Sequence, residues 1–205
     1  MLSSFYCRLP LSPEPLHLSI DPASMERALI GRDYWRVSPD EIPDGLPYKQ
    51  SIVKYAQSIN KCEERGFGLY LYGPLGTGKT ALAVIALKAA IIRGGTALLM
   101  TASEIQRAYT ARTMPILSNG ATVEEALVNV QFLAIDDFGA EDQKTEWKQQ
   151  HTELVIRARQ RDRLPTIITS NIAPKDLPQD WLKSILNKHF MILNVAGKDW
   201  RARES

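Results

Sequence analysis

Residues 69–90 read LYLYGPLGTGKTALAVIALKAA: an apolar run, a glycine-rich turn, and a long apolar-striped segment. The turn from Gly73 to Thr80 fits the pattern G-x-x-x-x-G-K-[ST]. Glycine tolerates positive φ and a close approach by a ligand, so the backbone N–H groups of such a turn can point at anionic oxygens. A helix that begins there adds the positive end of its dipole. The stretch therefore predicts a strand, a phosphate-binding loop and a helix.

The position of each residue in this loop predicts its role in binding a nucleotide. We expect Lys79 to reach the β and γ phosphates of a nucleotide and the Thr80 hydroxyl to ligate Mg²⁺. The alternative is a strand-to-helix turn that binds nothing, but the apolar segments directly before and after it favour the phosphate loop. The predicted nucleotide-contacting residues are Gly73, Pro74, Leu75, Gly76, Thr77, Gly78, Lys79, Thr80 and Ala81.

A second motif, VQFLAIDDFG at residues 130–139, places two acids after an apolar run. Magnesium at a phosphate loop needs an acidic partner at the end of a neighbouring strand. We expect Asp136 to be the metal-associated carboxylate and Asp137 to polarise the attacking water. The alternative is a solvated strand end that happens to carry two acids.

A third motif, LPTIITSN at residues 164–171, ends an apolar strand in polar residues. Ligands of open parallel sheets bind beyond the carboxyl ends of the strands. Asn171 is therefore a candidate to orient water near the γ phosphate, and the alternative is a turn asparagine.

Composition narrows the class of protein. The chain has 205 residues, enough for one sizeable core, and its net charge of +2 is too mild to indicate nucleic-acid binding. Cys7 and Cys62 share no metal-ligand spacing, so we expect a reducing, cytoplasmic location. No apolar stretch reaches the roughly 20 residues that span a bilayer, and we expect neither a membrane segment nor a secretion signal.

The chain divides by composition near residue 45. Residues 1–45 are rich in proline and predict an arm, with one short helix over 22–31 capped by Asp21. This arm is a candidate partner contact, and the alternative is an arm that packs on its own core. The apolar and aromatic residues proposed for such a contact are Leu9, Leu11, Leu16, Leu18, Tyr34 and Trp35.

From residue 46 to 205 we expect a single ATPase domain of alternating strands and helices. Five apolar strands separated by helices predict a mostly parallel sheet covered on both faces. The expected strands are 67–72, 96–101, 132–135, 166–169 and 191–195. The expected helices are 48–66, 78–93, 103–112, 122–129, 144–163 and 179–188.

In this order the motifs resemble the AAA+ ATPases of the DnaC/IstB type, which are replicative helicase loaders and ATP-binding helpers of transposition. The stretches that carry the resemblance are YLYGPLGTGKTALAVIAL, ALLMTASEI, FLAIDDFGAE, PTIITSNI and LNVAGKDWR. The resemblance implies a P-loop NTPase with an AAA+ core, an α/β fold with strand order 5-1-4-3-2, and no C-terminal helical lid. It also implies that the protein binds ATP and Mg²⁺, and that Asn171 is the sensor of the γ phosphate.

The resemblance further implies partners: a replicative helicase, single-stranded DNA, and other copies of the chain that associate through their nucleotide sites. We therefore expect an ATPase that acts in DNA replication as a helicase loader. The alternatives are an IstB-like transposition helper, which would bind duplex DNA and a transposase, and an adaptor that binds ATP without hydrolysing it. A small-molecule kinase would need an arginine-rich lid after the third strand, and the sequence has none there.

One residue departs from the family pattern. The family carries an arginine just before the last strand that reaches the γ phosphate of the neighbouring subunit, and here Lys188 stands at that place. An ammonium group cannot bond two phosphate oxygens with the fork of a guanidinium, so we expect Lys188 to support only slow hydrolysis.

A run of four arginines, RARQRDR at residues 157–163, ends the last long predicted helix. It is interpreted either as a solvated face whose charges favour the helix C-terminus or as a contact to phosphates.

Overall fold

One parallel sheet organises the chain. The computed structural model describes residues 16, 18–111, 115–139 and 146–197, with only the backbone of 146–149. Its strands are β1 (Gly68–Tyr72), β2 (Ala97–Thr101), β3 (Phe132–Phe138), β4 (Thr166–Ser170) and β5 (Phe190–Asn194). They lie in the order β2-β3-β4-β1-β5, and every neighbouring pair is parallel. The predicted order 5-1-4-3-2 is confirmed, and all five strands end at the same edge.

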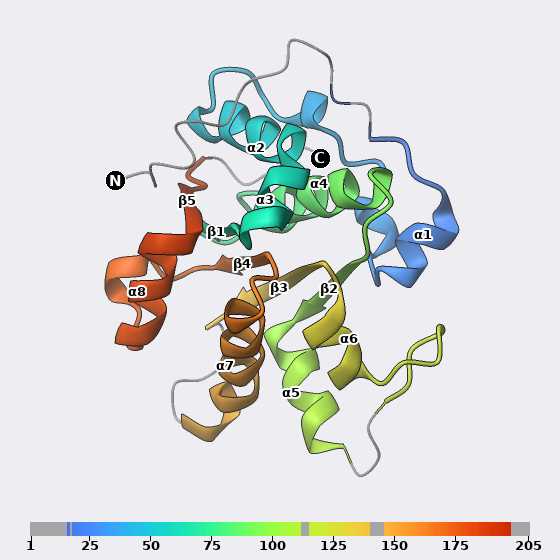
Figure 1. The fold of residues 1–205 in the computed structure, drawn as a ribbon. Coiled ribbons are helices and arrows are strands. Elements are labelled where there is room, and N and C mark those ends of the chain that lie inside the picture. Colours follow the sequence, from blue (N-terminus) through green and yellow to red (C-terminus); the bar gives the residue numbers. More distant parts are fainter. Residues whose placement is uncertain (1–15, 17, 112–114, 140–145, 198–205) are drawn as a thin grey trace.

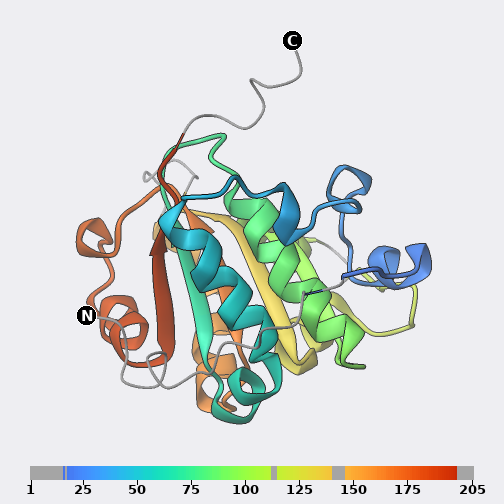
Figure 2. The same cartoon turned by 90° about the horizontal axis from the view of Figure 1, so that it is seen from above.

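Helices cover both faces of the sheet (Figures 1 and 2). One hydrophobic cluster joins alternate strand residues to the helices on the first face, and a second cluster does the same on the other face. The first face carries α1 (Pro22–Arg27), α2 (Pro47–Gln57), α3 (Ile59–Arg65) and α4 (Lys79–Ile92). The second carries α5 (Ala102–Thr110), α6 (Val123–Asn129), α7 (Glu146–Arg161) and α8 (Asp180–His189).

Helix α4 follows β1 through the phosphate loop and is buried almost all round. It packs on the sheet beside α2, and 11 of its 14 residues are buried. A helix that is apolar on every side is normally a core helix or a membrane span. Within the described residues no helix combines enough length and hydrophobicity to cross a bilayer.

Most predicted elements are found within a few residues of their expected bounds, and the caps have clear causes. Asp21 accepts a hydrogen bond from the Ser24 amide at the start of α1, and Thr122 and Glu125 form a capping box at the start of α6. The single helix predicted over 48–66 is wrong, because the chain breaks at Ser58 into α2 and α3. The first residues of the helix predicted over 144–163 lie outside the described part.

A segment that precedes α2 wraps along the sheet and α4; we call residues 28–46 the strap. The Leu99 amide of edge strand β2 donates to the Ala28 carbonyl at 2.9 Å. The buried ammonium of Lys88 on α4 donates to the carbonyls of Trp35 and Val37, each at 2.7 Å. Burial lowers the pKa of Lys88, and the two carbonyls supply the hydrogen bonds that a desolvated ammonium needs.

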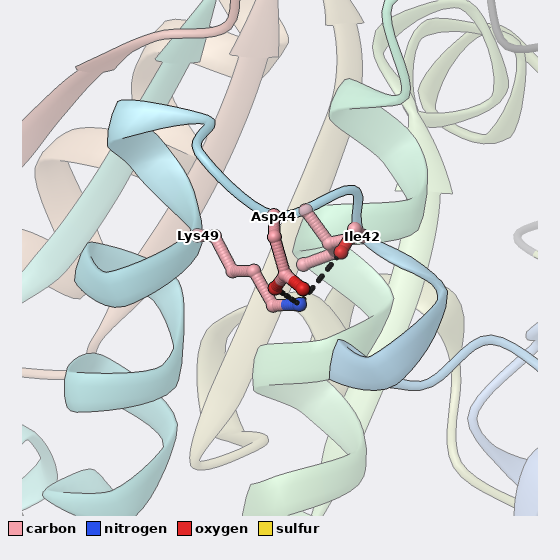
Figure 3. Close-up of polar contacts among 3 residues, drawn as sticks. All are labelled: Ile42, Asp44 and Lys49. Atoms are coloured by element: carbon pink, nitrogen blue, oxygen red, sulfur yellow. Dashed lines mark hydrogen bonds and ion pairs between the residues drawn. The ribbon is translucent and has the colours of Figure 1, made fainter.

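A second lysine holds the other end of the strap. Lys49 of α2 donates to the Ile42 carbonyl and to an Asp44 carboxylate oxygen, both at 2.7 Å (Figure 3). The Ile42 side chain is 1% exposed, so the strap also contributes to the core. The proposed division of the chain at residue 45 stays a prediction.

The candidate contact residues of the arm fall in two groups. Leu9 and Leu11 lie outside the described residues. The others are partly buried against the core cluster of the first face: Leu16, Leu18, Tyr34 and Trp35.

The arginine run at 157–163 does not form one charged face. Arg159 has no exposed surface, and its guanidinium makes five hydrogen bonds of 2.8–3.1 Å with neutral acceptors. Burial lowers the pKa of Arg159 to about 9, so it is still protonated at neutral pH. Both interpretations of this residue from sequence are wrong; it joins α7 to the starts of β3 and β4. The acceptors are Thr166 Oγ1 and the carbonyls of Leu127, Val130, Gln131 and Pro165.

Replacing Arg159 with methionine should lower the free energy of unfolding by about 3 kcal/mol or more, because four carbonyls around a buried guanidinium lose their donor. Urea denaturation of the purified chain measures this. R161M is the matched control: Arg161 is exposed and pairs with its neighbour Asp162, so its loss should have little effect. Equal stability of the two variants would contradict the role given to Arg159.

Candidate nucleotide-binding site

The phosphate loop has backbone geometry that its glycines make possible. Gly78 has φ 87° and caps α4, where a side chain would be strained. Gly73 has φ 155°, and a Cβ there would lie 2.3 Å from the Val195 carbonyl oxygen. The first turn of α4 contains no acidic residue, so no side chain of the helix itself opposes the positive end of its dipole.

Two side chains of the loop close it on itself. Thr77 is buried and donates from its hydroxyl to the Pro74 carbonyl at 2.9 Å. Lys79 is 6% exposed, and its ammonium donates to the carbonyls of Gly73 at 2.9 Å and Pro74 at 2.7 Å. The positive charge is therefore held at the mouth of the loop by neutral acceptors, which an anion can replace.

Asp136 on β3 lies beside the start of α4. The Thr80 hydroxyl is 3.0 Å from both carboxylate oxygens, and the Thr169 hydroxyl of β4 makes a short hydrogen bond to Oδ1. Burial raises the pKa of Asp136, the adjacent Asp137 adds to the increase, and the two hydroxyl donors oppose it. The sheet thus holds a carboxylate whose charge is poorly solvated.

Asp137 differs from Asp136 in exposure and in backbone conformation. It is exposed and has φ 54°, a left-handed conformation that is rare for a residue other than glycine. The pairing of β3 with β4 passes from Ile135–Ile168 to Phe138–Ser170, so two acids on β3 face one threonine on β4. This bulge turns the Asp137 side chain out of the sheet. The strand predicted to end at Ile135 in fact continues to Phe138.

A cavity of about 660 Å³ lies at this edge of the sheet. Its size is within the range of small-molecule sites. The sequence-predicted residues that line it are Leu75, Gly76, Gly78, Lys79, Thr80, Ala81, Asp136 and Asp137. Gly73, Pro74 and Thr77 contribute to the loop without lining the cavity.

Sequence analysis missed two residues that line this cavity, Asp33 and Tyr34. Both belong to the short turn η2 (Arg32–Tyr34) of the strap. Tyr34 also lines an adjoining hollow of about 600 Å³, which shares Thr80 and Asp136 with the cavity. The signal in the sequence was the aromatic pair Tyr34 and Trp35 in a proline-containing segment.

Two predicted catalytic residues do not line the cavity. Asn171 is exposed directly after β4, at the correct edge of the sheet. Lys188 is exposed in the last turn of α8, two residues before β5 begins, and so lies at the opposite edge from the loop. Within one copy of the chain, Lys188 cannot reach a phosphate in this cavity.

A larger cavity, of about 780 Å³, lies beside edge strand β2 between α1 and α6. Its ionisable groups are engaged locally: Arg27 donates to Ser24, and Glu125 accepts from Thr122 in the capping box. We assign the functional site to the smaller cavity, where Lys79, the two acids of β3 and the N-terminus of α4 converge.

The residues at the smaller cavity fit a nucleotide with Mg²⁺. Hard oxygen donors, the Thr80 hydroxyl and the Asp136 carboxylate, lie side by side where the loop presents its amides. Lys79 supplies the matching charge for phosphate oxygens. The donor set thus suits a cation that shares its shell with phosphate rather than one enclosed by protein alone.

Comparison with known proteins shows which proteins the chain resembles. No protein-family model matches the chain. The chain is 26% identical over 156 residues to the replicative helicase loader DnaI of Bacillus subtilis (strain 168); the match covers 75% of this chain and 48% of DnaI. The chain therefore spans about half the length of that relative.

Solved structures share the fold. A crystal structure of DnaI matches with a TM-score of 0.65 and 21% identity, over 82% of this chain and 93% of that one. The replication initiator DnaA, bound to AMPPCP and single-stranded DNA, matches with a TM-score of 0.62 and 20% identity, over 80% of this chain and 50% of that one.

The sheet order and the phosphate loop define a P-loop NTPase fold with the strand order that the resemblance to AAA+ ATPases implies. Within that class, the match to DnaI confirms the resemblance to DnaC/IstB-type helicase loaders that the motifs indicate.

Replacing Asp136 with asparagine should stabilise the nucleotide-free protein at neutral pH. A carboxyl whose pKa is raised above its ordinary 3.8 binds more protons folded than unfolded, so its contribution to stability falls as pH rises through the raised pKa. The wild type should therefore lose stability relative to D136N between about pH 4 and about pH 7. Chemical denaturation at both pH values measures the difference.

D162N provides the control. The pKa of exposed Asp162 is lowered, mainly by its hydrogen bond with Arg161, so the trend for this variant should have the opposite sign. Parallel pH profiles for wild type and D136N would contradict the burial argument.

Proposed function

We propose that this chain is an ATP-binding and ATP-hydrolysing AAA+ protein that acts in DNA replication as a helicase loader. Its nucleotide state would control delivery of a replicative helicase onto single-stranded DNA. The observation that carries the nucleotide part is the convergence of Lys79, Thr80 and Asp136 on one cavity. The loading part rests on the similarity to DnaI.

The residues of the loop would bind and orient the substrate. Lys79 exchanges the carbonyls of Gly73 and Pro74 for phosphate oxygens, and the loop amides take up the remaining charge. Thr80 and Asp136 would hold Mg²⁺, which would supply positive charge to offset the charge that develops on the phosphates. Asp137 orients the attacking water, and Asn171 lies at the strand end from which an amide can contact the γ phosphate.

The strap gives this site a link to the rest of the chain. Asp33 and Tyr34 line the cavity, while Lys88 and Lys49 fix the same segment to α4 and α2. A ligand that contacts Tyr34 would therefore also contact the part of the chain for which a partner contact is proposed.

Self-association and trans catalysis form part of the proposal. Because Lys188 lies at the opposite edge from the loop, its ammonium can serve only the nucleotide of another copy. An arginine at such a position is worth about 10³- to 10⁵-fold in rate, and a lysine lacks its bidentate geometry. We infer slow hydrolysis by the chain alone, and the same residue favours the second candidate function, an adaptor that binds ATP without turnover.

Nucleotide-dependent capture of a helicase tests the proposal. The tagged chain should retain the replicative helicase of its host from purified components in the presence of Mg²⁺ and ATP. K79A should weaken ATP binding in calorimetry by about tenfold or more and remove the nucleotide dependence of capture. K61A, on the exposed face of α3, is the matched control.

The same assay separates the alternatives. Capture of a transposase with duplex DNA, but not of the helicase, would identify a transposition helper. Absence of any heat of binding from ATP or ADP, with or without Mg²⁺, would contradict the whole proposal.

K188R should raise the steady-state ATPase rate by about tenfold or more at protein concentrations that permit self-association, since it restores a forked donor. K183R is the control on the same helix, because Lys183 pairs with Asp180 at 3.0 Å. A rate for K188R equal to that of the wild type at every concentration would contradict the trans role.

A further inference from the structure

We propose that Thr169 is a positioning residue that fixes both acids of the site through one hydroxyl group. The inference rests on the proposed ATPase function and adds to it a residue of the third motif to which sequence analysis assigned no role. Thr169 has no exposed surface and lies on β4, between the strand that ends at the phosphate loop and the strand that carries the acids.

The hydrogen bonds of this hydroxyl have a fixed direction. The Asp137 amide, 3.0 Å away, can only donate, so Thr169 Oγ1 accepts there. Its own proton is then left for Asp136 Oδ1, with which it makes the short hydrogen bond. The order Asp137 N–H to Thr169 O–H to Asp136 carboxylate follows from donor chemistry alone.

Thr80 completes the arrangement from the other side. Its hydroxyl also lies within 3.0 Å of the Asp136 carboxylate, so two hydroxyl groups can donate to one buried anion. These donors hold the carboxylate oriented between α4 and β4. A side chain without a hydroxyl at position 169 would leave Asp136 with the Thr80 donor alone.

Thr169 also holds the bulge in β3. It is the single residue on β4 that faces both Asp136 and Asp137 across the register shift. A left-handed backbone at a residue other than glycine is strained and persists where surrounding contacts fix it. The hydrogen bond from the Asp137 amide to Thr169 is such a contact, and without it Asp137 is free to relax toward ordinary strand geometry.

A purely structural role makes a different prediction. Position 169 is a buried strand position, which valine fills with nearly the same shape and equal or better strand propensity. If shape were the only requirement, T169V would leave the site intact. If the hydroxyl positions the acids, T169V should bind nucleotide and fail in the chemical step.

Steady-state kinetics and calorimetry on the full chain separate these roles. T169V should lower kcat by about 10- to 100-fold and change KM and the affinity for ADP by less than about threefold. T169S keeps the hydroxyl and should return kcat to within about threefold of the wild type. T166V is the matched control, since Thr166 is a buried threonine at the other end of β4 that bonds Arg159; its kcat should be unchanged.

A second readout does not depend on activity. Amide hydrogen exchange measured by NMR should show the Asp137 amide losing protection by about tenfold or more in T169V, but not in T169S or T166V. This measurement tests the hydrogen bond in the nucleotide-free protein.

The outcomes are distinct. Wild-type kcat in T169V, an equal loss in T166V, failure of T169S to restore the rate, or failure of T169V to fold would each overturn the positioning role. A wild-type protein that binds no nucleotide would overturn the proposed function instead, while the exchange of the Asp137 amide would still decide whether Thr169 holds the bulge.

Discussion

The parallel pairing of the sheet is the constraint on which the site depends. Because β4 lies between β1 and β3, and all three run the same way, their carboxyl ends meet at one edge. The phosphate loop, the acid pair and Thr169 come from three strands separated by dozens of residues in sequence. No local interaction brings them together; the order of the strands does, and the apolar clusters on the two faces of the sheet stabilise that order.

Charged groups, rather than apolar contacts alone, hold the irregular segments of this chain. Lys88 and Lys49 bind strap carbonyls, Arg159 binds the carbonyls that precede β3 and β4, and Lys79 closes the phosphate loop. A loop has many backbone acceptors that its own geometry leaves unpaired, and a long cationic side chain can satisfy several of them at once. The same chemistry that fixes a structural loop with Arg159 leaves Lys79 ready to exchange its neutral acceptors for an anion.

The sequence predicted the parts of the fold and site that rest on local pattern. The apolar strands, the capping residues and the glycine-rich turn each follow from a few adjacent residues, and the strand order followed from the family resemblance. The burial of Arg159 could not be predicted, because a helical arginine run gives no sign of which member faces inward. The approach of Asp33 and Tyr34 to the cavity depends on Lys49 and Lys88, which lie farther along the chain and hold the strap. The bulge in β3 depends on one threonine of another strand.

Two features of the acid pair oppose folding, and this opposition is the best physical argument that the edge of the sheet is functional. Burial raises the pKa of Asp136, so ionising it costs stability, and Asp137 holds a left-handed backbone that a strand residue would ordinarily avoid. Asparagine at the first position and glycine at the second would relieve both without disturbing the core. A chain under selection for stability alone has no use for either acid. The two acids have a common explanation if the buried Asp136 carboxylate binds a cation and the bulge orients the Asp137 carboxylate toward a substrate held by the loop.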